Sequence, residues 1–112
     1  MRSSPLYSSG PPRKHSRFEA MAHEVVDDEA RQRYELQLPG GVAFIDYTDA
    51  GKVRTFAHAE VPAALRGGGI AARLTGGALE LAREQGLKVI ARCPYVSSFI
   101  DRHPQYQDLL SR

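Results

Sequence analysis

A run of three glycines behind an arginine, Arg66-Gly67-Gly68-Gly69-Ile70-Ala71, constrains this chain more than any other feature. It lies where a β-rich run gives way to a helix-like pattern. Glycine turns tightly and lets the backbone approach a ligand without an intervening Cβ. The first amides of a helix have no internal partners and lie at the positive end of its dipole, so such an entry suits a phosphate or pyrophosphate. We therefore expect a cofactor at residues 66–72, and the alternative is a flexible turn before an ordinary helix.

The segments on both sides of the glycines predict one strand–helix–strand unit. Residues 53–61 alternate as a strand that Pro62 ends. Apolar residues recur at helical spacing over residues 70–85, and Gly86 stands at the position of a C-terminal cap. Residues 87–93 form a second β-rich run. Such a unit is expected to have parallel strands and a right-handed connection.

Two details of this unit give sharper expectations. Strict alternation along the first strand places one set of side chains together on one face: Arg54, Phe56, His58 and Glu60. Within the helix, Gly76 and Gly77 each cost roughly 1 kcal/mol relative to alanine. We expect close packing of the helix on the sheet to compensate for that cost.

The chain before this unit reads as an antiparallel meander. Residues 34–38 alternate, Pro39-Gly40-Gly41 predicts a turn into residues 42–47, and Asp49-Ala50-Gly51 predicts a turn into the strand that carries His58. Residues 23–27 are a candidate first edge strand. The predicted fold class is therefore α/β, with a mixed sheet whose antiparallel N-terminal meander leads into one parallel βαβ unit.

Three classes of phosphate-binding loop compete for the glycine run. A nucleoside triphosphate loop needs Gly-Lys-Ser or Gly-Lys-Thr, and the sequence contains neither. Gly67-x-Gly69-x-x-Ala72 satisfies a loose dinucleotide fingerprint, but Arg92 and Cys93 stand where a ribose-binding acid belongs. A doubly wound sheet also needs several βαβ units, and this chain has room for one.

The third class fits better. Arg66-x-x-Gly69-x-Ala71 resembles the Gln/Arg-x-x-Gly-x-Gly/Ala pyrophosphate loop of the GNAT superfamily of acetyl-CoA-dependent N-acetyltransferases. Residues 58–62, 87–95 and 102–104 resemble, in the same order, the small GNAT-like family of minimal acetyltransferases. The resemblance implies a GNAT-type sheet, acetyl-CoA as the cofactor and transfer of an acetyl group to an amine. The sequence does not identify this amine acceptor, which is a small molecule or a protein.

The resemblance also implies the residues of the site. The expected cofactor-binding residues are Val61, Arg66, Gly67, Gly68, Gly69, Ile70, Ala71, Ala72, Cys93, Tyr95 and Arg102. The candidate catalytic residues are His58, Glu60 and Cys93. Backbone amides near Val61 are expected to polarise the thioester carbonyl. Arg102 either contacts the adenosine phosphate of CoA or is a solvated helix end.

An amine acceptor is protonated at neutral pH, so a base must take a proton before attack. His58 is the first candidate for that base and Glu60 the second. Cys93, at the N-terminus of a short helix that begins with Pro94, is either a nucleophile that carries the acetyl group, an acid that reprotonates the CoA thiolate, or a small buried hydrophobe. The sequence leaves these alternatives open.

Length and composition predict a single small domain at residues 21–112. A chain of 112 residues buries roughly 65% of its unfolded surface. No apolar run approaches the roughly 20 residues that span a bilayer, and no metal-ligating cluster is apparent. One cysteine excludes an internal disulfide and is typical of a reducing cytoplasm, where we expect the protein to be.

Residues 1–20 differ from the rest of the chain. They are rich in serine and proline and hold four basic residues against one acidic residue, which predicts a disordered basic head. The alternatives are a transit peptide and an extension before a start at Met21. The remainder has a balance of about −1, so nucleic acid is not the expected partner. Two other functions stay open: a CoA or acyl-CoA binding module without catalysis, and a small domain whose head binds nucleic acid or an acidic protein.

Overall fold

A mixed five-stranded sheet forms the frame of the protein. The computed structural model describes residues 17–111. The strands are β1 (Val25–Asp28), β2 (Arg33–Leu38), β3 (Gly41–Ala50), β4 (Val53–Glu60) and β5 (Lys88–Ala91). They lie side by side in chain order, with antiparallel pairs from β1 to β4 and a parallel pair between β4 and β5. The predicted meander and the single parallel βαβ unit are therefore confirmed.

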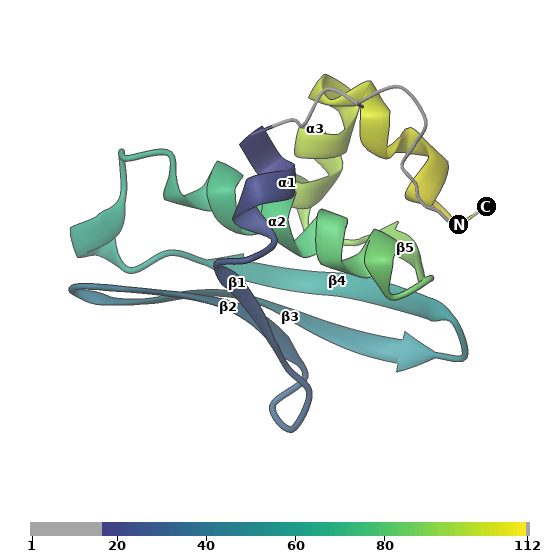
Figure 1. Ribbon diagram of the computed structural model, residues 1–112, viewed down its shortest axis with the longest axis horizontal. Coiled ribbons are helices and arrows are strands. Elements are labelled where there is room, and N and C mark those ends of the chain that lie inside the picture. The colour runs from purple at the N-terminus through teal and green to yellow at the C-terminus, as the bar shows by residue number, and fades with distance from the viewer. Residues whose placement is uncertain (1–16, 112) are drawn as a thin grey trace, which may run out of the picture.

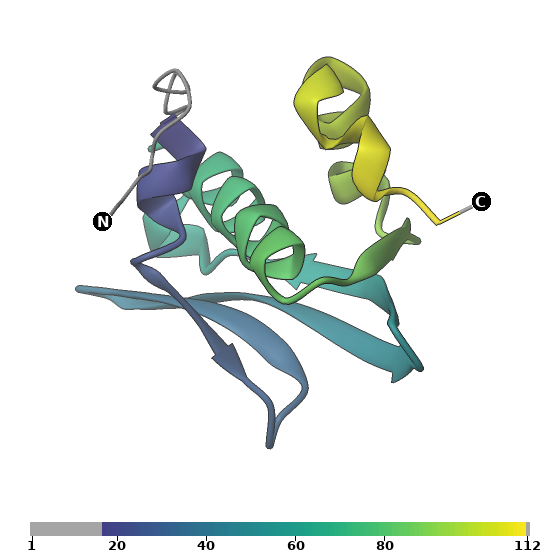
Figure 2. The same ribbon diagram turned by 45° about the vertical axis from the view of Figure 1, so that its right-hand side comes forward.

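The helices cover one face of this sheet (Figures 1 and 2). Within residues 17–111 they are α1 (Arg17–Met21), α2 (Ile70–Glu84) and α3 (Pro94–Arg102), with two 3₁₀ helices, η2 (Ala63–Leu65) and η3 (Pro104–Leu109). The core lies between α2, α3 and the sheet, where Tyr34, Ile45, Phe56, Leu74, Leu79 and Val96 are fully buried. No helix within residues 17–111 is long and apolar enough to cross a membrane.

The glycines at the C-terminal end and in the interior of α2 have separate structural reasons. Gly86, with φ +74°, ends the helix in the left-handed conformation, and the Leu87 amide donates to the Ala82 carbonyl. Gly77, inside the helix, has a packing reason: a Cβ there would lie 2.5 Å from Cγ2 of Val25 and 2.9 Å from the Met21 carbonyl oxygen. The predicted close packing is therefore against α1 and the first residue of β1.

The helix α1 changes the predicted domain boundary. Phe18 is 5% exposed, and its ring packs edge-on against Phe99 at 5.3 Å and His103 at 5.2 Å between centroids. The predicted boundary between residues 20 and 21 therefore falls inside a helix that belongs to the core. Apolar burial outweighs the head-like composition around Phe18. The remainder of the predicted head, residues 1–16, lies outside the described residues.

A β-bulge in β4 changes which of its side chains share a face. Phe56 pairs with Tyr47, whereas His58 pairs with Asp46, so Ala57 is an extra residue on β4. The extra residue reverses the alternation. Phe56 is fully buried under the helices, and the side chain of His58 is 61% exposed. The expectation that Phe56 and His58 share a face is therefore wrong.

A buried polar network lies at the opposite end of β4 from His58. The guanidinium of Arg54, with its side chain 7% exposed, donates to both carboxylate oxygens of Asp49 at 2.7 and 2.8 Å and to Asp27 at 3.0 Å. It also donates to the Tyr34 hydroxyl at 2.9 Å and lies 3.6 Å from the centre of the Tyr47 ring. This network joins four strands, and the Arg54 guanidinium holds the pKa of Asp49 below its usual range.

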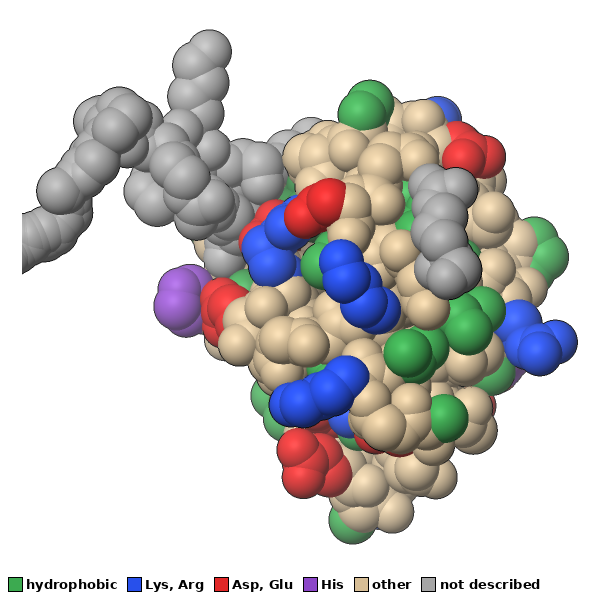
Figure 3. Space-filling view, turned by 90° about the vertical axis from the view of Figure 1, so that its right-hand side faces the viewer, with side chains coloured by type: hydrophobic (Ala, Val, Ile, Leu, Met, Phe, Trp, Pro, Cys, Tyr) green, Lys and Arg blue, Asp and Glu red, His purple; other side chains and the backbone are tan. Residues whose placement is uncertain are grey.

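Charges of both signs are mixed on the surface near the C-terminal end. On the face drawn in Figure 3, basic side chains lie among acidic and apolar ones. Arg83 and Asp108 form an ion pair of 2.7 Å, and this hydrogen bond from the guanidinium lowers the pKa of the Asp108 carboxyl. Such mixing gives this face no large field of one sign.

Candidate functional site

The glycine run forms the entry to α2. Its first glycine, Gly67, has φ +90°, and Gly69, the N-cap of α2, has φ +74°. Both values lie in the left-handed region that side chains with a Cβ rarely adopt. A Cβ built on Gly67 or on Gly69 meets no heavy atom within 4 Å, so the loop faces open space. The glycines therefore serve the backbone conformation and leave room beside it.

The first turn of α2 can bind an anion. The N-cap Gly69 contributes no side-chain hydrogen bond, and the first turn carries no acidic residue. The earliest helical hydrogen bond runs from the Arg73 amide to the Gly69 carbonyl, so the amides before Arg73 are those that an α-helix leaves without an internal partner. These amides and the helix dipole favour a phosphate group at this point.

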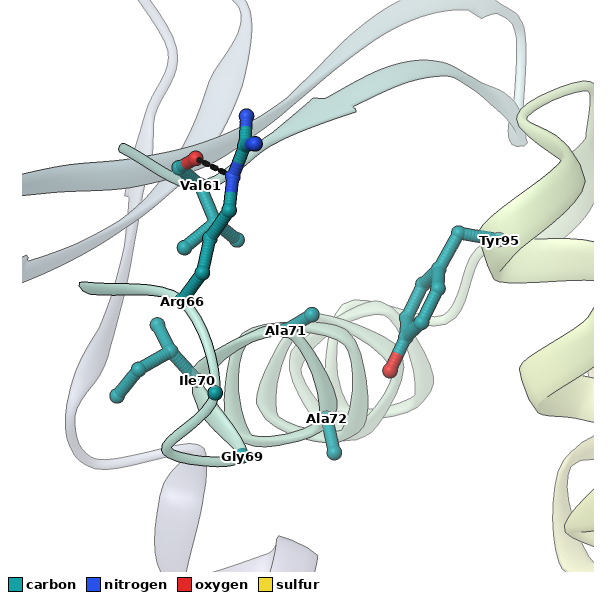
Figure 4. A pocket seen from close by; sticks show the side chains of 8 residues that line it. Val61, Arg66, Gly69, Ile70, Ala71, Ala72 and Tyr95 are labelled. Atoms are coloured by element: carbon teal, nitrogen blue, oxygen red, sulfur yellow. Dashed lines mark hydrogen bonds between the residues drawn. The ribbon is translucent and has the colours of Figure 1, made fainter. Parts of the chain in front are cut away.

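A pocket of about 160 Å³ lies beside this loop. Its lining residues are Val61, Arg66, Gly67, Gly69, Ile70, Ala71, Ala72 and Tyr95. In Figure 4, Tyr95 reaches from α3 toward the first turns of α2, and the Arg66 side chain extends toward Val61. Arg66 Nε donates to the Val61 carbonyl at 3.1 Å. That bond uses one donor of the guanidinium, and the residue is exposed, so its other donors can face a ligand.

A larger pocket of about 440 Å³ continues from the first, because Val61, Arg66, Ala71 and Tyr95 line both. Its other lining residues are His58, Ala59, Glu60, Leu74 and Thr75. The pocket exists because β4 and β5 part: their pairing ends at Phe56 and Ala91, and the amides of Arg92 and Cys93 both donate to the Phe56 carbonyl. Beyond that point the edge of β4 faces the pocket.

His58 and Glu60 lie together at this pocket. His58 Nε2 and Glu60 Oε1 are 3.2 Å apart, and their side chains are 61% and 56% exposed. The two residues follow the bulge on the same face of β4, so the carboxylate can orient the imidazole while solvent or a substrate reaches both. This pair has the composition of a base and its positioning group.

Cys93 occupies a different environment. It is the N-cap of α3, as the sequence predicts for the residue before Pro94, and it is 6% exposed. Its amide is bonded to the Phe56 carbonyl at 3.1 Å. Cys93 is absent from the lining of both pockets described above. The structure therefore places Cys93 near the bulge but packs it in the core.

The remaining predicted residues divide between the pocket and the surface. Tyr95 is half-buried at the pocket. Burial raises the pKa of its phenol, and the positive charge of Arg102 offsets only part of this rise. Arg102 itself is exposed at the last turn of α3, where its Nη1 donates to the Ser98 hydroxyl at 2.7 Å. Neither Arg102 nor Gly68 lines the two pockets. Three lining residues could not be predicted, because nothing in their local sequence pattern distinguishes them from core residues: Ala59, Leu74 and Thr75.

Comparisons with known proteins show which family this chain resembles. The family model described as GCN5-related N-acetyl-transferase matches residues 33–109. Protein NATD1 of Xenopus tropicalis is 32% identical over 105 residues, which cover 80% of this chain and 95% of that protein. Protein NATD1 of Homo sapiens is 34% identical over 88 residues, covering 76% of this chain and 78% of that protein.

A solved structure has the same fold. The solution structure of a GCN5-like protein from Staphylococcus aureus superposes with a TM-score of 0.60 at 25% sequence identity. The superposition covers 79% of this chain and 87% of that one.

Proposed function

The chain belongs to the GCN5-related N-acetyltransferase family, and we propose that it transfers an acetyl group from acetyl-CoA to an amine. The observation that carries this proposal is the glycine entry to α2, which opens directly onto the pocket beside the edge of β4. An anion site and a partly apolar channel with a base at its side are the parts that such a transfer needs.

The residues present fit CoA. The amides of the first turn of α2 would hold the pyrophosphate, because they lack internal partners and lie at the positive end of the helix. Arg66 would add a positive charge with free donors at the same place. Apolar walls at Val61, Ala71 and Leu74 suit a chain that leads from the pyrophosphate into the larger pocket.

Bound acetyl-CoA would supply the acetyl group as a thioester. Attack by an unprotonated amine would form the C–N bond and break the C–S bond, the nitrogen would lose a further proton as the amide forms, and the departing CoA thiolate would take up a proton from solvent. We assign to His58 the removal of the amine proton, directly or through water. Glu60, 3.2 Å away, would hold the imidazole in place. The exposure of both side chains leaves the acceptor side open, so either a small amine or an amine on a protein can approach.

Direct transfer is the route we propose, in preference to an acetyl-cysteine intermediate. A nucleophile must reach the thioester carbon, and an acid must reach the departing CoA thiolate, so either role needs a thiol at the pocket. Cys93 is 6% exposed and lies outside the lining of both pockets. Its burial at the start of α3 supports a packing role, with α3 held against β4 through the Phe56 carbonyl.

Mass spectra of the full chain with acetyl-CoA test this proposal. Native spectra are expected to report a non-covalent complex, and denaturing spectra are expected to show the wild-type chain without an added acetyl group. After a panel of amines is added, Cys93→Ala should transfer acetyl at a rate within about threefold of wild type, because the thiol takes no chemical part.

Three results would count against the account. A covalent acetyl that disappears in Cys93→Ala would establish the cysteine nucleophile instead. Binding without transfer to any amine would favour a CoA-binding module. Absence of binding at micromolar acetyl-CoA would remove the cofactor assignment itself.

A further inference from the structure

Thr75 is a polar residue in an otherwise apolar wall of the larger pocket. It lies on α2 beside Ala71 and Leu74, which face the same space. The residue is fully buried, and its Oγ1 has no hydrogen-bond partner within residues 17–111. Every other buried side-chain nitrogen or oxygen in that part of the chain has a partner. Thr75 is therefore the exception that needs a physical reason.

The free hydroxyl is costly to the unliganded protein. A buried threonine inside a helix can donate to the carbonyl three or four residues earlier, here that of Ala72 or Ala71, and Thr75 does not. A buried hydroxyl without a partner costs free energy that valine, of nearly the same shape, would not cost. A partner that arrives with a ligand would remove this cost.

The position of Thr75 indicates which part of a ligand it meets. It lies six residues after Gly69, the N-cap at the anion site, which corresponds to about 9 Å along the helix axis. His58 and Glu60 mark the reactive end of the same pocket on β4. Thr75 thus lines the part of the pocket beyond the anion site, where the pantetheine arm of a bound CoA, with its two amides and its hydroxyl, would pass.

We propose that the Thr75 hydroxyl is a hydrogen-bond partner of the pantetheine arm. A hydroxyl can donate to an amide carbonyl and accept from an amide N–H, so it suits an amide-bearing chain in an apolar channel. Thr75 is then a binding residue that acts on CoA and acetyl-CoA alike. The inference rests on the proposed function, because it takes CoA as the ligand.

The substitution Thr75→Val separates this role from a structural one. Calorimetric titration of the full chain is expected to show affinity about fivefold weaker for both CoA and acetyl-CoA, the range of one lost neutral hydrogen bond. Urea unfolding without ligand is expected to show a midpoint equal to or above that of wild type, since no partner is lost. Thr75→Ser, which keeps the hydroxyl, should bind more tightly than Thr75→Val.

The control is Thr55→Val, because Thr55 lies on β4, pairs with Thr48 of β3 and does not line the pocket. It should leave both affinities unchanged. Unchanged affinity in Thr75→Val would overturn the inference while leaving the proposed function intact. Weakening for acetyl-CoA alone would also overturn it, because the hydroxyl would then meet the acetyl group. Failure of wild type to bind CoA would overturn the proposed function and this inference together.

Discussion

Alanine in place of His58 is expected to lower kcat of acetyl transfer by about 10²–10⁴-fold, the usual contribution of a positioned general base. The dissociation constant for CoA should stay within about twofold, because the imidazole lies at the reactive end of the pocket and not at the anion site. Initial rates with a saturating amine, together with a CoA titration, measure the two effects separately. Added imidazole should restore part of the lost rate.

Two further substitutions show whether the effect belongs to this histidine. His23 is exposed and lies outside both pockets, so His23→Ala should keep the wild-type rate. Glu60→Gln should lower kcat less than His58→Ala, because Glu60 only positions the imidazole. A greater loss in Glu60→Gln than in His58→Ala would show that Glu60 is the base.

The largest expected effect on stability comes from Arg54→Met. The substitution leaves the carboxylates of Asp27 and Asp49 without the cation that they share. It also removes the hydrogen bond that Arg54 donates to the Tyr34 hydroxyl. Removing one member of a buried ion pair typically costs 3–5 kcal/mol, and we expect a loss of about that size in the free energy of unfolding. Urea denaturation followed by circular dichroism measures it.

An exposed arginine provides the matched control. The side chain of Arg31 is 67% exposed and lies 3.7–3.8 Å from Asp28 and Glu35, so Arg31→Met should change stability by less than about 1 kcal/mol. Equal effects of the two substitutions would contradict the structural role of the Arg54 network.

The pH dependence of stability gives a second readout of the same network. Arg54 lowers the folded-state pKa of Asp49, so the stability from this pair is present above the ordinary aspartate range and is lost as the pH falls through the lowered pKa. Arg54→Met should therefore flatten the acid limb of the stability curve, which unfolding series below about pH 4 would report.

Much of the fold could be predicted because local rules and tertiary packing agree over residues 33–102. Gly69 and Gly86 bound α2 as their backbone freedom suggests, and Pro94 starts α3. The bulge at Ala57 could not be predicted, because no glycine or proline marks it and its cause lies in the pairing with β3. One extra residue moved His58 away from the face of Phe56 and onto the open side of the sheet.

The residues of the site were predictable where they belong to a local motif. Three adjacent glycines make the loop from Arg66 to Ala72 recognisable in the sequence. Every residue of this loop except Gly68 lines the smaller pocket. Thr75 could not be found from the sequence, because only its neighbours in the folded chain show that its hydroxyl lacks a partner. Phe18 was hidden for a similar reason, since its contacts with Phe99 and His103 come from the far end of the chain.

Titration of CoA into three proteins, wild type, Gly69→Ala and Gly86→Ala, shows whether the glycine entry to α2 binds CoA. Both glycines have φ +74°, and an added Cβ at either meets nothing within 4 Å, so the backbone strain is matched at about 1–2 kcal/mol. Of these two glycines, Gly69 lines the smaller pocket and Gly86 lines neither pocket. We expect micromolar binding by wild type and Gly86→Ala, and affinity at least about tenfold weaker for Gly69→Ala, because its Cβ would enter the space of the pyrophosphate. Equal affinities in all three proteins, or no binding by wild type, would contradict this expectation.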